Sequence, residues 1–479
     1  MKKSIISFSA MSIAVVIAAT CMLPAMAGDS RGGAAAISLQ TPFSASSLEF
    51  VQLREILDDF EARNASVRVT LLPDGPREHD RILRRILANK SADLLEIPLS
   101  VLPELAKRSA VTPVNEDLAD AVGTLFPSVI AAVQRQGVLY AVPLRADSTQ
   151  LIYSPAVLAK AGYDPKAPLL DNWNQLLITC AGIRRAMGGS YCPLGIDGAE
   201  GDSLGRLAAM FVCQNQGRVI QETQSDDGSG TEWVIPINND DGIRALDLMA
   251  KLSAFAPPEA MGWTHRDLAD AFIAGRIAMF YGDARMIGEI RSRAPATRVM
   301  AAQAPANKVS AAYVDLYGVV MTAPATGGEY AEQCRKLLAY LCSKESQAVV
   351  MTGGRSGLPV MAPVQRGLLD AAWYDEHPEY RVFLEALWQP CAGVPNPGWS
   401  EVERQVLLPE LRRLMMRQTT PERAAEAIYT RGSQVLATYQ GYVGHISETT
   451  ALGMGVAAVG VFFMVYFAVG YRPRHNAPG

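Results

Sequence analysis

The sequence predicts an α/β protein of two lobes, and three observations lead to this fold class. First, 479 residues are too many for one compact core and indicate at least two units. Second, apolar strands alternate with amphipathic helices near the N-terminus, which predicts a parallel sheet with right-handed crossovers. Third, Trp263 to Arg285 contains a helix, a short buried strand and a Gly turn in succession, as expected at the ligand-binding edge of such a sheet.

The N-terminal part begins with a strand, a helix and a second strand. Ala34 to Gln40 is the first predicted strand, Phe50 to Phe60 carry the buried face of the helix, and Val67 to Leu72 is the next strand. A second helix over Arg77 to Asn89 leads to a third strand at Asp93 to Ile97. This order places the carboxyl ends of the strands at one edge, where a ligand would bind.

The third observation rests on local signals. Thr264 and Asp267 form a capping box that starts a helix. The strand that follows ends at Tyr281, and a glycine then lets a new helix begin at Asp283. Helix N-termini offer free N–H groups at the carboxyl ends of strands, so we expect the segment from Tyr281 to Arg285 to face a cleft.

The composition is that of an ordinary globular protein, with 49% hydrophobic residues and a formal net charge of -4. Nucleic-acid binding would need a basic stripe, which the sequence lacks. The five histidines are scattered singly, and no phosphate-loop, His-Glu-x-x-His or Gly-x-Ser-x-Gly motif is present. We therefore expect no metal, no cofactor and no enzymatic activity, although carboxylate pairs alone leave a glycosidase open.

The N-terminus has the three parts of a secretory signal peptide. Two lysines precede a largely apolar run from Ile5 to Leu23, and Ala25-Met26-Ala27 is a small-x-small cleavage site. We expect residues 1–27 to be removed. Acylation of Cys21 in a lipoprotein is the alternative, but the residues before Cys21 form a poor approach to such a site.

The C-terminus predicts a transmembrane helix. Ala451 to Tyr471 is uncharged throughout, and a helix of that length, at ~1.5 Å per residue, spans roughly 31 Å, about the thickness of the hydrocarbon core. Arg472 and Arg474 follow at once, which places residues 472–479 in the cytoplasm. The body of the chain is then held at its C-terminus on the periplasmic or extracellular side of the cell membrane.

Disulfides are allowed in that compartment, and six cysteines follow the signal peptide. We expect Cys180 to pair with Cys192, because a helix end and the next strand start can bring their Cα atoms to the necessary ~5.5–6 Å. Cys334 and Cys342 lie ~12 Å apart along one predicted helix and cannot join each other there. Metal binding is less favoured, because no Cys-x-x-Cys spacing exists.

The helix–strand–turn stretch resembles the signature of extracellular solute-binding proteins, in the sugar-binding family that includes maltose-binding protein. The matching residues are Phe272, Gly275, Ala278, Met279 and Gly282. Other stretches resemble the family in the expected order over roughly residues 36–438. The resemblance implies a periplasmic-binding-protein fold of type II, a Venus flytrap in which hinge crossings let two lobes close on a ligand.

The resemblance also divides the chain. It implies an N-terminal lobe of residues 28–145 and 299–352 and a C-terminal lobe of residues 146–298 and 353–446, followed by the membrane span at 451–471. Gly137 to Pro143 resembles the element that ends the first lobe, so Arg145 to Ser148 should form the first hinge crossing. Val299 to Ala304 should return the chain to the first lobe, and Gly353 to Pro359 resembles the turn before the third crossing.

A sugar suits such a cleft because an aromatic face stacks on the ring while carboxylates accept hydrogen bonds from the hydroxyls. We expect Tyr281 and Trp399 to stack, and Asp147, Asp197 and Asp283 to accept hydrogen bonds. The remaining candidates for ligand contact are Thr41, Ser100, Glu200, Arg285 and Arg355. The loop with Asp197 and Glu200 is as readily interpreted as solvated, and the same holds for Arg355.

Arg285 departs from the family, which often has Gly-x-Trp where this chain has Asp283-Ala284-Arg285. A guanidinium group there favours a charged ligand, because arginine pairs with carboxylate or phosphate. The alternative is a structural role in which Arg285 pairs with Asp283 or Glu289 and holds the turn. We favour the structural role.

The function implied by the resemblance is capture of a small solute, a carbohydrate by preference, and its delivery to the permease subunits of an ABC importer. The membrane span adds an alternative, in which the chain is a tethered sensor or an accessory subunit of a membrane complex. Because residues 472–479 are too few for a signalling domain, a partner protein would have to supply one.

Overall fold

The computed structural model describes residues 35–75, 79–116, 118, 121–166, 170–199, 201–224, 231–392 and 398–438. The expected signal peptide at residues 1–27, the expected membrane span at residues 451–471 and Glu200 lie outside these ranges. Among the residues that are described, no helix is both long and apolar enough to cross a membrane.

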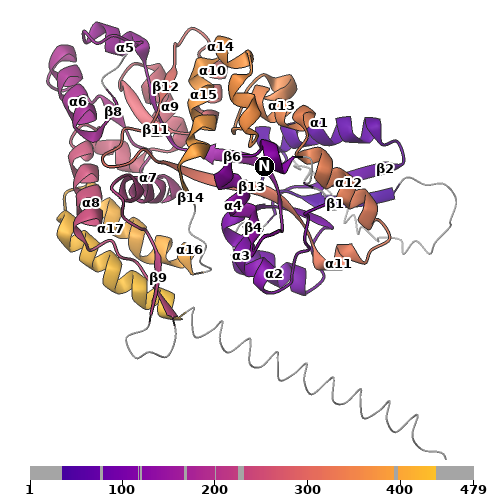
Figure 1. The fold of residues 1–479 in the computed structure, drawn as a ribbon. Coiled ribbons are helices and arrows are strands. Elements are labelled where there is room, and N and C mark those ends of the chain that lie inside the picture. Colours follow the sequence, from indigo (N-terminus) through magenta and orange to yellow (C-terminus); the bar gives the residue numbers. More distant parts are fainter. Residues whose placement is uncertain are drawn as a thin grey trace, which may run out of the picture.

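Two sheets with helices packed around them form two lobes (Figure 1). The first sheet has the order β14 (Pro390–Ala392), β13 (Ala312–Met321), β3 (Leu94–Pro98), β1 (Ala35–Gln40) and β2 (Val67–Leu72), with β6 (Val142–Ser148) also paired to β13. Strand β1 is parallel to β2 and β3, as the strand–helix–strand order predicts, whereas β13 is antiparallel to β3 and β6. The central strand β13 therefore comes from a much later part of the chain than its neighbour β3.

Helices of the first lobe bury one apolar face each. In α1 (Leu48–Arg63) the residues at helical spacing, Leu53, Ile56, Leu57 and Phe60, are at most 2% exposed. The other helices assigned to this lobe are α2 (His79–Leu87), α3 (Leu102–Lys107), α4 (Pro127–Val133), α11 (Ala323–Thr326), α12 (Ala331–Leu341) and α13 (Lys344–Thr352).

The second sheet is smaller, with the order β12 (Met300–Ala302), β7 (Gln150–Tyr153), β11 (Met279–Gly282) and β8 (Leu194–Gly195). The helices around it are α5 (Pro155–Lys160), α6 (Trp173–Met187), α7 (Gly201–Gln214), α8 (Asp240–Ser253), α9 (His265–Ile273), α10 (Ala284–Arg293), α16 (Trp399–Val402), α17 (Leu408–Met415) and a helix over residues 421–438. Two short antiparallel pairs, β4 (Gln134–Arg135) with β5 (Val138–Leu139) and β9 (Gln221–Gln224) with β10 (Thr231–Val234), are the other strands of the described residues.

The segment that the sequence defined best has the predicted structure. Thr264 and Asp267 make both hydrogen bonds of the capping box at the start of α9. Strand β11 follows, and Asp283 is the N-cap of α10, where its side chain accepts a hydrogen bond from the Met286 N–H. The edge of the second sheet at Tyr281 is thus built as the local signals indicate.

The chain passes between the two sheets at two points, and after β14 it reaches helices of the second lobe again. Strand β6 lies in the first sheet and β7 in the second, so the first crossing falls at Thr149, directly after the predicted residues 145–148. The expectation that Val299 to Ala304 returns to the first lobe is wrong for β12, which pairs with β7; the chain re-enters the first sheet only at β13. Two helices, α14 (Trp373–Glu376) and α15 (Pro378–Glu385), precede β14 in the chain. After β14, the helix α16 belongs to the second lobe.

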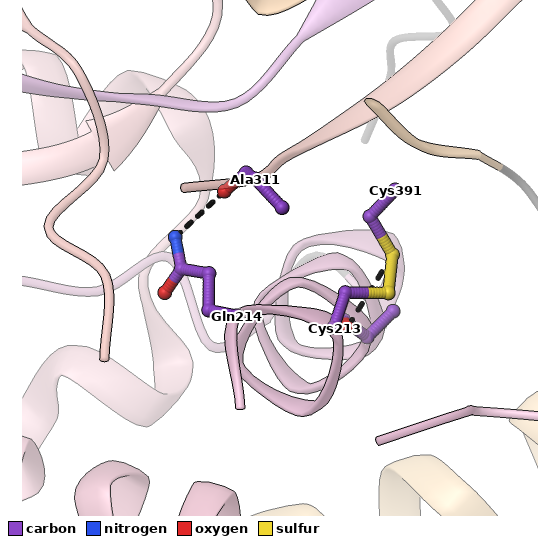
Figure 2. Close-up of a disulfide and its surroundings, with 5 residues drawn as sticks. Cys213, Gln214, Ala311 and Cys391 are labelled. Atoms are coloured by element: carbon purple, nitrogen blue, oxygen red, sulfur yellow. Dashed lines mark hydrogen bonds between the residues drawn. A yellow bond between two sulfur atoms is a disulfide. The ribbon is translucent and has the colours of Figure 1, made fainter. Parts of the chain in front are cut away.

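A disulfide joins Cys213 of α7 to Cys391 of β14, with a Cα–Cα distance of 6.1 Å (Figure 2). The predicted pair of Cys180 and Cys192 is therefore wrong, and both of these cysteines are free. Cys180 is buried in α6, and Cys192 lies just before β8. Local spacing could not predict the actual pair, because its members are 178 residues apart and meet only when β14 packs against α7.

Candidate functional site

A small polar cavity lies at the carboxyl end of β11, where the second lobe faces the hinge. Its volume is about 30 Å³, which is room for about two water molecules. The polar lining consists of Thr149, Asp197, Ser203, Arg206, His265, Tyr281 and Asp283. Ligand pockets usually measure about 300–1,000 Å³, so a sugar does not fit into the cavity at this size.

Three elements of the second lobe meet at Asp197. This carboxylate follows β8, and its Oδ2 accepts a hydrogen bond of 2.8 Å from Ser203 Oγ at the start of α7. The Nδ1 atom of His265, the first residue of α9, lies 2.5 Å from the same oxygen. Asp197 is 5% exposed, so these contacts fix an acidic group at the wall of the cavity.

Arg285 connects the cavity to the first lobe. Its Nη2 is 2.6 Å from Asp283 Oδ2 and 3.6 Å from Asp147 Oδ2, and its Nη1 is 3.3 Å from Oε1 of Glu49 in α1. Burial disfavours the charged form of Asp283, but the Arg285 guanidinium, together with Arg206, lowers the pKa of Asp283 overall. The structural pairing of Arg285 with Asp283 is confirmed, whereas Glu289 pairs with Arg293 instead.

Arg206 of α7 makes a second connection across the hinge. Its guanidinium is 3.1 Å from Asp147 Oδ2 and 3.0 Å from Asp315 Oδ2. Asp147 and Asp315 lie directly opposite each other on β6 and β13. Like charges at opposed strand positions repel each other, so Arg206 is the counter-ion that lets both carboxylates stay there.

Two buried polar atoms beside this network have no hydrogen-bond partner among the described residues. They are Oδ1 of Asp147 and the hydroxyl oxygen of Tyr281, whose residues are 3% and 7% exposed. Burial raises the pKa of Asp147 to about 6, and the Asp283 carboxylate adds to this rise. A buried acceptor without a donor is costly, so this edge of the site is suited to a bound molecule that donates hydrogen bonds.

The first-lobe side of the cleft holds a separate buried network. Arg145 donates to both oxygens of Glu96, from Nε at 2.7 Å and from Nη2 at 2.8 Å, and its Nη1 donates to the Glu49 carbonyl at 3.0 Å. Thr41 Oγ1 donates to Glu96 Oε2 at 2.6 Å. These contacts tie the ends of β1 and β3 to the start of α1, and they occupy the Thr41 hydroxyl.

The ten predicted contact residues are therefore distributed unevenly. Asp197, Tyr281 and Asp283 line the cavity, and Asp147 and Arg285 are joined to it by ion pairs. Thr41 and Ser100 lie at the strand ends of the first lobe, with Ser100 in the 3₁₀ turn after β3.

Two of the ten lie elsewhere, and one lies outside the described residues. The Arg355 side chain is 76% exposed near Glu55 of α1, and Trp399 is buried at 8% exposure at the start of α16. Neither lines the cavity. Glu200 is the residue outside the described ranges.

Sequence reasoning missed several charged residues of the site. Glu96 and Asp315 each stand inside an apolar strand, LLEIP and AYVDLYGVVM. A charge in a buried strand is rare without a partner, so both could have been identified from that signal. Arg206, His265 and Glu49 lie on helices, and only tertiary packing turns them towards the cleft.

A larger pocket in the second lobe contains none of the predicted ligand contacts. It has a volume of about 1050 Å³ and lies in the second lobe between α5, the end of α10 and α15. Its lining includes Tyr153, at the end of β7 away from the hinge, and none of the ten predicted residues. The charged cluster at the hinge end of the same strand remains the candidate site.

Residues 55–382 match the family model described as bacterial extracellular solute-binding protein. No curated protein sequence matches the chain. The sugar-binding protein MalE from the phytopathogen Xanthomonas citri is a similar solved structure, with 18% identity and a TM-score of 0.70 over 85% of this chain and 99% of that chain.

Two further solved structures are similar. Maltose-bound MalE3 of T. maritima has 19% identity and a TM-score of 0.67, over 83% of this chain and 99% of that chain. UgpB from Mycobacterium tuberculosis, in complex with glycerophosphocholine, has 17% identity and a TM-score of 0.65, over 85% of this chain and 100% of that chain. At these identities the likeness is one of fold, a two-lobed solute-binding architecture.

Proposed function

The chain belongs to the bacterial extracellular solute-binding proteins, and from this premise we propose that it captures a small polyhydroxylated solute, of the carbohydrate class, between its lobes. The captured solute is then delivered to the permease subunits of an ABC importer. The observation that carries this proposal is the polar cavity at the hinge, where Asp197, Asp283 and the Tyr281 hydroxyl lie together. Carboxylates and a hydroxyl are suited to the hydroxyl groups of a sugar or polyol.

Capture without chemical change is part of the proposal. Two of the similar solved structures support it, since MalE of Xanthomonas citri is a sugar-binding protein and MalE3 of T. maritima is bound to maltose. The lobes would open about the crossings between them, admit the solute and close again. A solute recovered from the denatured protein should have the same mass as the one supplied, and a hydrolysed product would contradict this part.

We also propose that residues 451–471 anchor the chain in the cell membrane, with the lobes on the outer side. The support is the uncharged sequence of this segment followed by Arg472 and Arg474. Removing residues 451–479 should release the protein from the membrane. If uptake of the solute is then lost but is restored by excess free protein, the anchor serves delivery; if it is not restored, the chain acts in a fixed complex.

The binding site is tested by thermal unfolding of the full chain in mild detergent, with neutral sugars and polyols. A ligand that binds only the folded state raises the melting temperature by mass action. For the sugar that stabilises the protein, Asp197→Asn and Asp283→Asn should each weaken binding about tenfold or more, since each removes a charged acceptor. Asn remains a good N-cap, so Asp283→Asn should leave α10 intact.

The matched control is Asp247→Asn. Asp247 pairs with Lys251 on the exposed surface of α8, and it lies outside the cavity lining. Asp247→Asn removes one negative charge, as each of the two site variants does. It should leave the affinity for the sugar unchanged. The proposed site is wrong if Asp197→Asn binds as the control does, and the carbohydrate class is wrong if no neutral sugar or polyol stabilises the chain.

A further inference from the structure

The two arginines that join the lobes at the cavity, Arg206 and Arg285, are already engaged by carboxylates of the chain. Arg206 contacts Asp147 and Asp315, and Arg285 contacts Asp283, Glu49 and, at 3.6 Å, Asp147. The cluster therefore contains two positive charges, on the two arginines, and four negative charges, on Glu49, Asp147, Asp283 and Asp315. The guanidinium groups are therefore counter-ions of the protein's own acids.

The cluster also has acceptor capacity that its own donors leave unused. Asp147 Oδ1 is buried without a donor among the residues that the structure describes, and Asp197 adds a further carboxylate to the cavity wall. A hydroxyl or an ammonium group of a ligand can donate to these oxygens, whereas ionised phosphate and carboxylate groups offer acceptors. An anion would also face an excess of negative charge, which disfavours binding.

We propose that this cleft selects against anionic solutes, and that Asp147 and Asp283 set the selectivity by holding Arg206 and Arg285 as counter-ions. The captured solute is then uncharged or carries a cationic group, and phosphorylated or carboxylated forms of the same skeleton are rejected. This inference rests on the proposed function of the same site, and it assigns Arg285 a role that its sequence position alone left open.

The selectivity can be measured with inorganic phosphate as the probe, independently of which sugar binds. Titration calorimetry on the full chain in detergent, with chloride at matched ionic strength as the reference, should show no saturable phosphate binding by the unchanged protein. The double variant Asp147→Asn with Asp283→Asn removes the acid that both arginines contact, Asp147, and the nearest partner of Arg285, Asp283. Asp315 and Glu49 then balance the two guanidinium groups one to one. This variant should gain saturable phosphate binding, about tenfold or more above the unchanged protein, because arginine pairs readily with phosphate.

The matched control is Asp58→Asn with Asp247→Asn. These acids form exposed pairs with Arg54 and Lys251 at helical spacing, so the control carries the same change in net charge away from the cleft. It should not gain phosphate binding. If the double site variant fails to fold by circular dichroism, Asp283→Asn alone is used, because asparagine preserves the cap of α10.

A second arm compares glucose with glucose 6-phosphate and with glucosamine, and repeats this for each sugar that stabilises the protein. The phosphorylated form should bind at least tenfold more weakly than its neutral parent, and the amino form should bind no more weakly. Saturable phosphate binding by the unchanged protein, a phosphorylated sugar that binds as well as its parent, or a folded site variant without phosphate binding would each overturn the inference. Absence of binding by every neutral sugar would instead refute the proposed carbohydrate ligand, while the phosphate titrations still decide the selectivity.

Discussion

Arg145 and Glu96 form a buried ion pair at the first-lobe edge of the cleft, with side chains 2% and 0% exposed. Removal of one member of such a pair leaves an uncompensated buried charge. Arg145→Met should therefore lower the free energy of unfolding by roughly 3–5 kcal/mol, measured by urea unfolding. The double variant Arg145→Met with Glu96→Leu should recover part of this loss. The exposed Lys251→Met, as control, should change stability by less than about 1 kcal/mol.

If Arg145→Met is as stable as the unchanged protein, the pair does not fix the strand ends. Thr41 would then have to be reconsidered as a ligand contact. In the structure its hydroxyl donates to Glu96, and only replacement of Glu96 removes that acceptor.

Asp147 should make stability depend on pH. Burial raises its pKa to about 6, above the value of about 3.9 for an exposed aspartate. The folded state therefore binds more protons in this range, and the contribution of Asp147 to the free energy of unfolding falls as pH rises from about 4 to 6. The charged groups that act on it are Asp283, Arg206, Arg285 and Asp315.

The measurement is urea unfolding at pH 4.5 and pH 7 for the unchanged protein and for Asp147→Asn. The difference in free energy of unfolding between the two proteins should change by on the order of 2–3 kcal/mol across this window. As pH rises, the unchanged protein should lose stability relative to Asp147→Asn. A difference that stays constant would show that Asp147 titrates as it does in the unfolded chain.

Single residues were predictable where a local signal placed them at a strand end. Asp197, Tyr281 and Asp283 follow β8 or belong to the end of β11, and the structure brings all three to one cavity. Arg206 and His265 were not predictable in this way, because the direction of a polar residue on α7 or α9 depends on how the helix packs. Spacing narrowed the local partner of Arg285 to Asp283 or Glu289, and the structure shows Asp283. Its contacts with Glu49 and Asp147 join distant parts of the chain and could not be predicted from spacing.

Among the elements, the unit of α9, β11 and α10 was predicted closely because a capping box, a glycine stop and an N-cap define it locally. The strand β12 was assigned to the wrong lobe because three residues of edge strand carry little pattern of their own. Its pairing with β7 depends on a neighbour that lies far away in the sequence. The same limit applies to the pairing of Cys213 with Cys391.

This disulfide joins two elements that meet at the hinge. Strand β14 belongs to the first sheet, and α7 carries Arg206 in the second lobe. Beside it, the Gln214 amide donates to the Ala311 carbonyl at 2.7 Å, just before β13 begins (Figure 2). The link therefore closes a loop of 178 residues and holds α7 against the strands that cross between the lobes.

Loss of the disulfide should lower the free energy of unfolding by roughly 2–5 kcal/mol, because a long loop is no longer closed in the unfolded chain. The test is urea unfolding of Cys213→Ser with Cys391→Ser, compared with the unchanged protein with and without a reducing agent. Cys192→Ser, which alters a free cysteine, is the control and should unfold like the unchanged protein. Equal stability of all three proteins would show that the link contributes nothing to the fold.

At the scale of the whole molecule, ion pairs between side chains connect the two lobes, in addition to the backbone crossings. Arg285 of α10 reaches Glu49 of α1 at 3.3 Å, and this pair should favour the closed arrangement of the empty protein. Partly exposed ion pairs contribute about 0.2–1 kcal/mol. Glu49→Gln should therefore raise the population of open molecules by up to about fivefold.

Fluorescence energy transfer reports this change, with labels introduced as unnatural amino acids at Leu87 of α2 and Ile178 of α6. Both side chains are exposed, at 63% and 65%. Glu332→Gln is the control, because Glu332 pairs with Lys336 within α12 and does not contact the other lobe. An unchanged transfer efficiency in Glu49→Gln would mean that this pair does not bias closure.

Strand β13 has a consequence for how the molecule is made. It pairs with β3 and β6 in the first sheet, yet it is synthesised after all four strands of the second sheet. The early part of the nascent chain therefore lacks the strand that completes its sheet. The first lobe can therefore complete its sheet only late in synthesis, because a pairing between strands so far apart in the sequence must wait for the later strand.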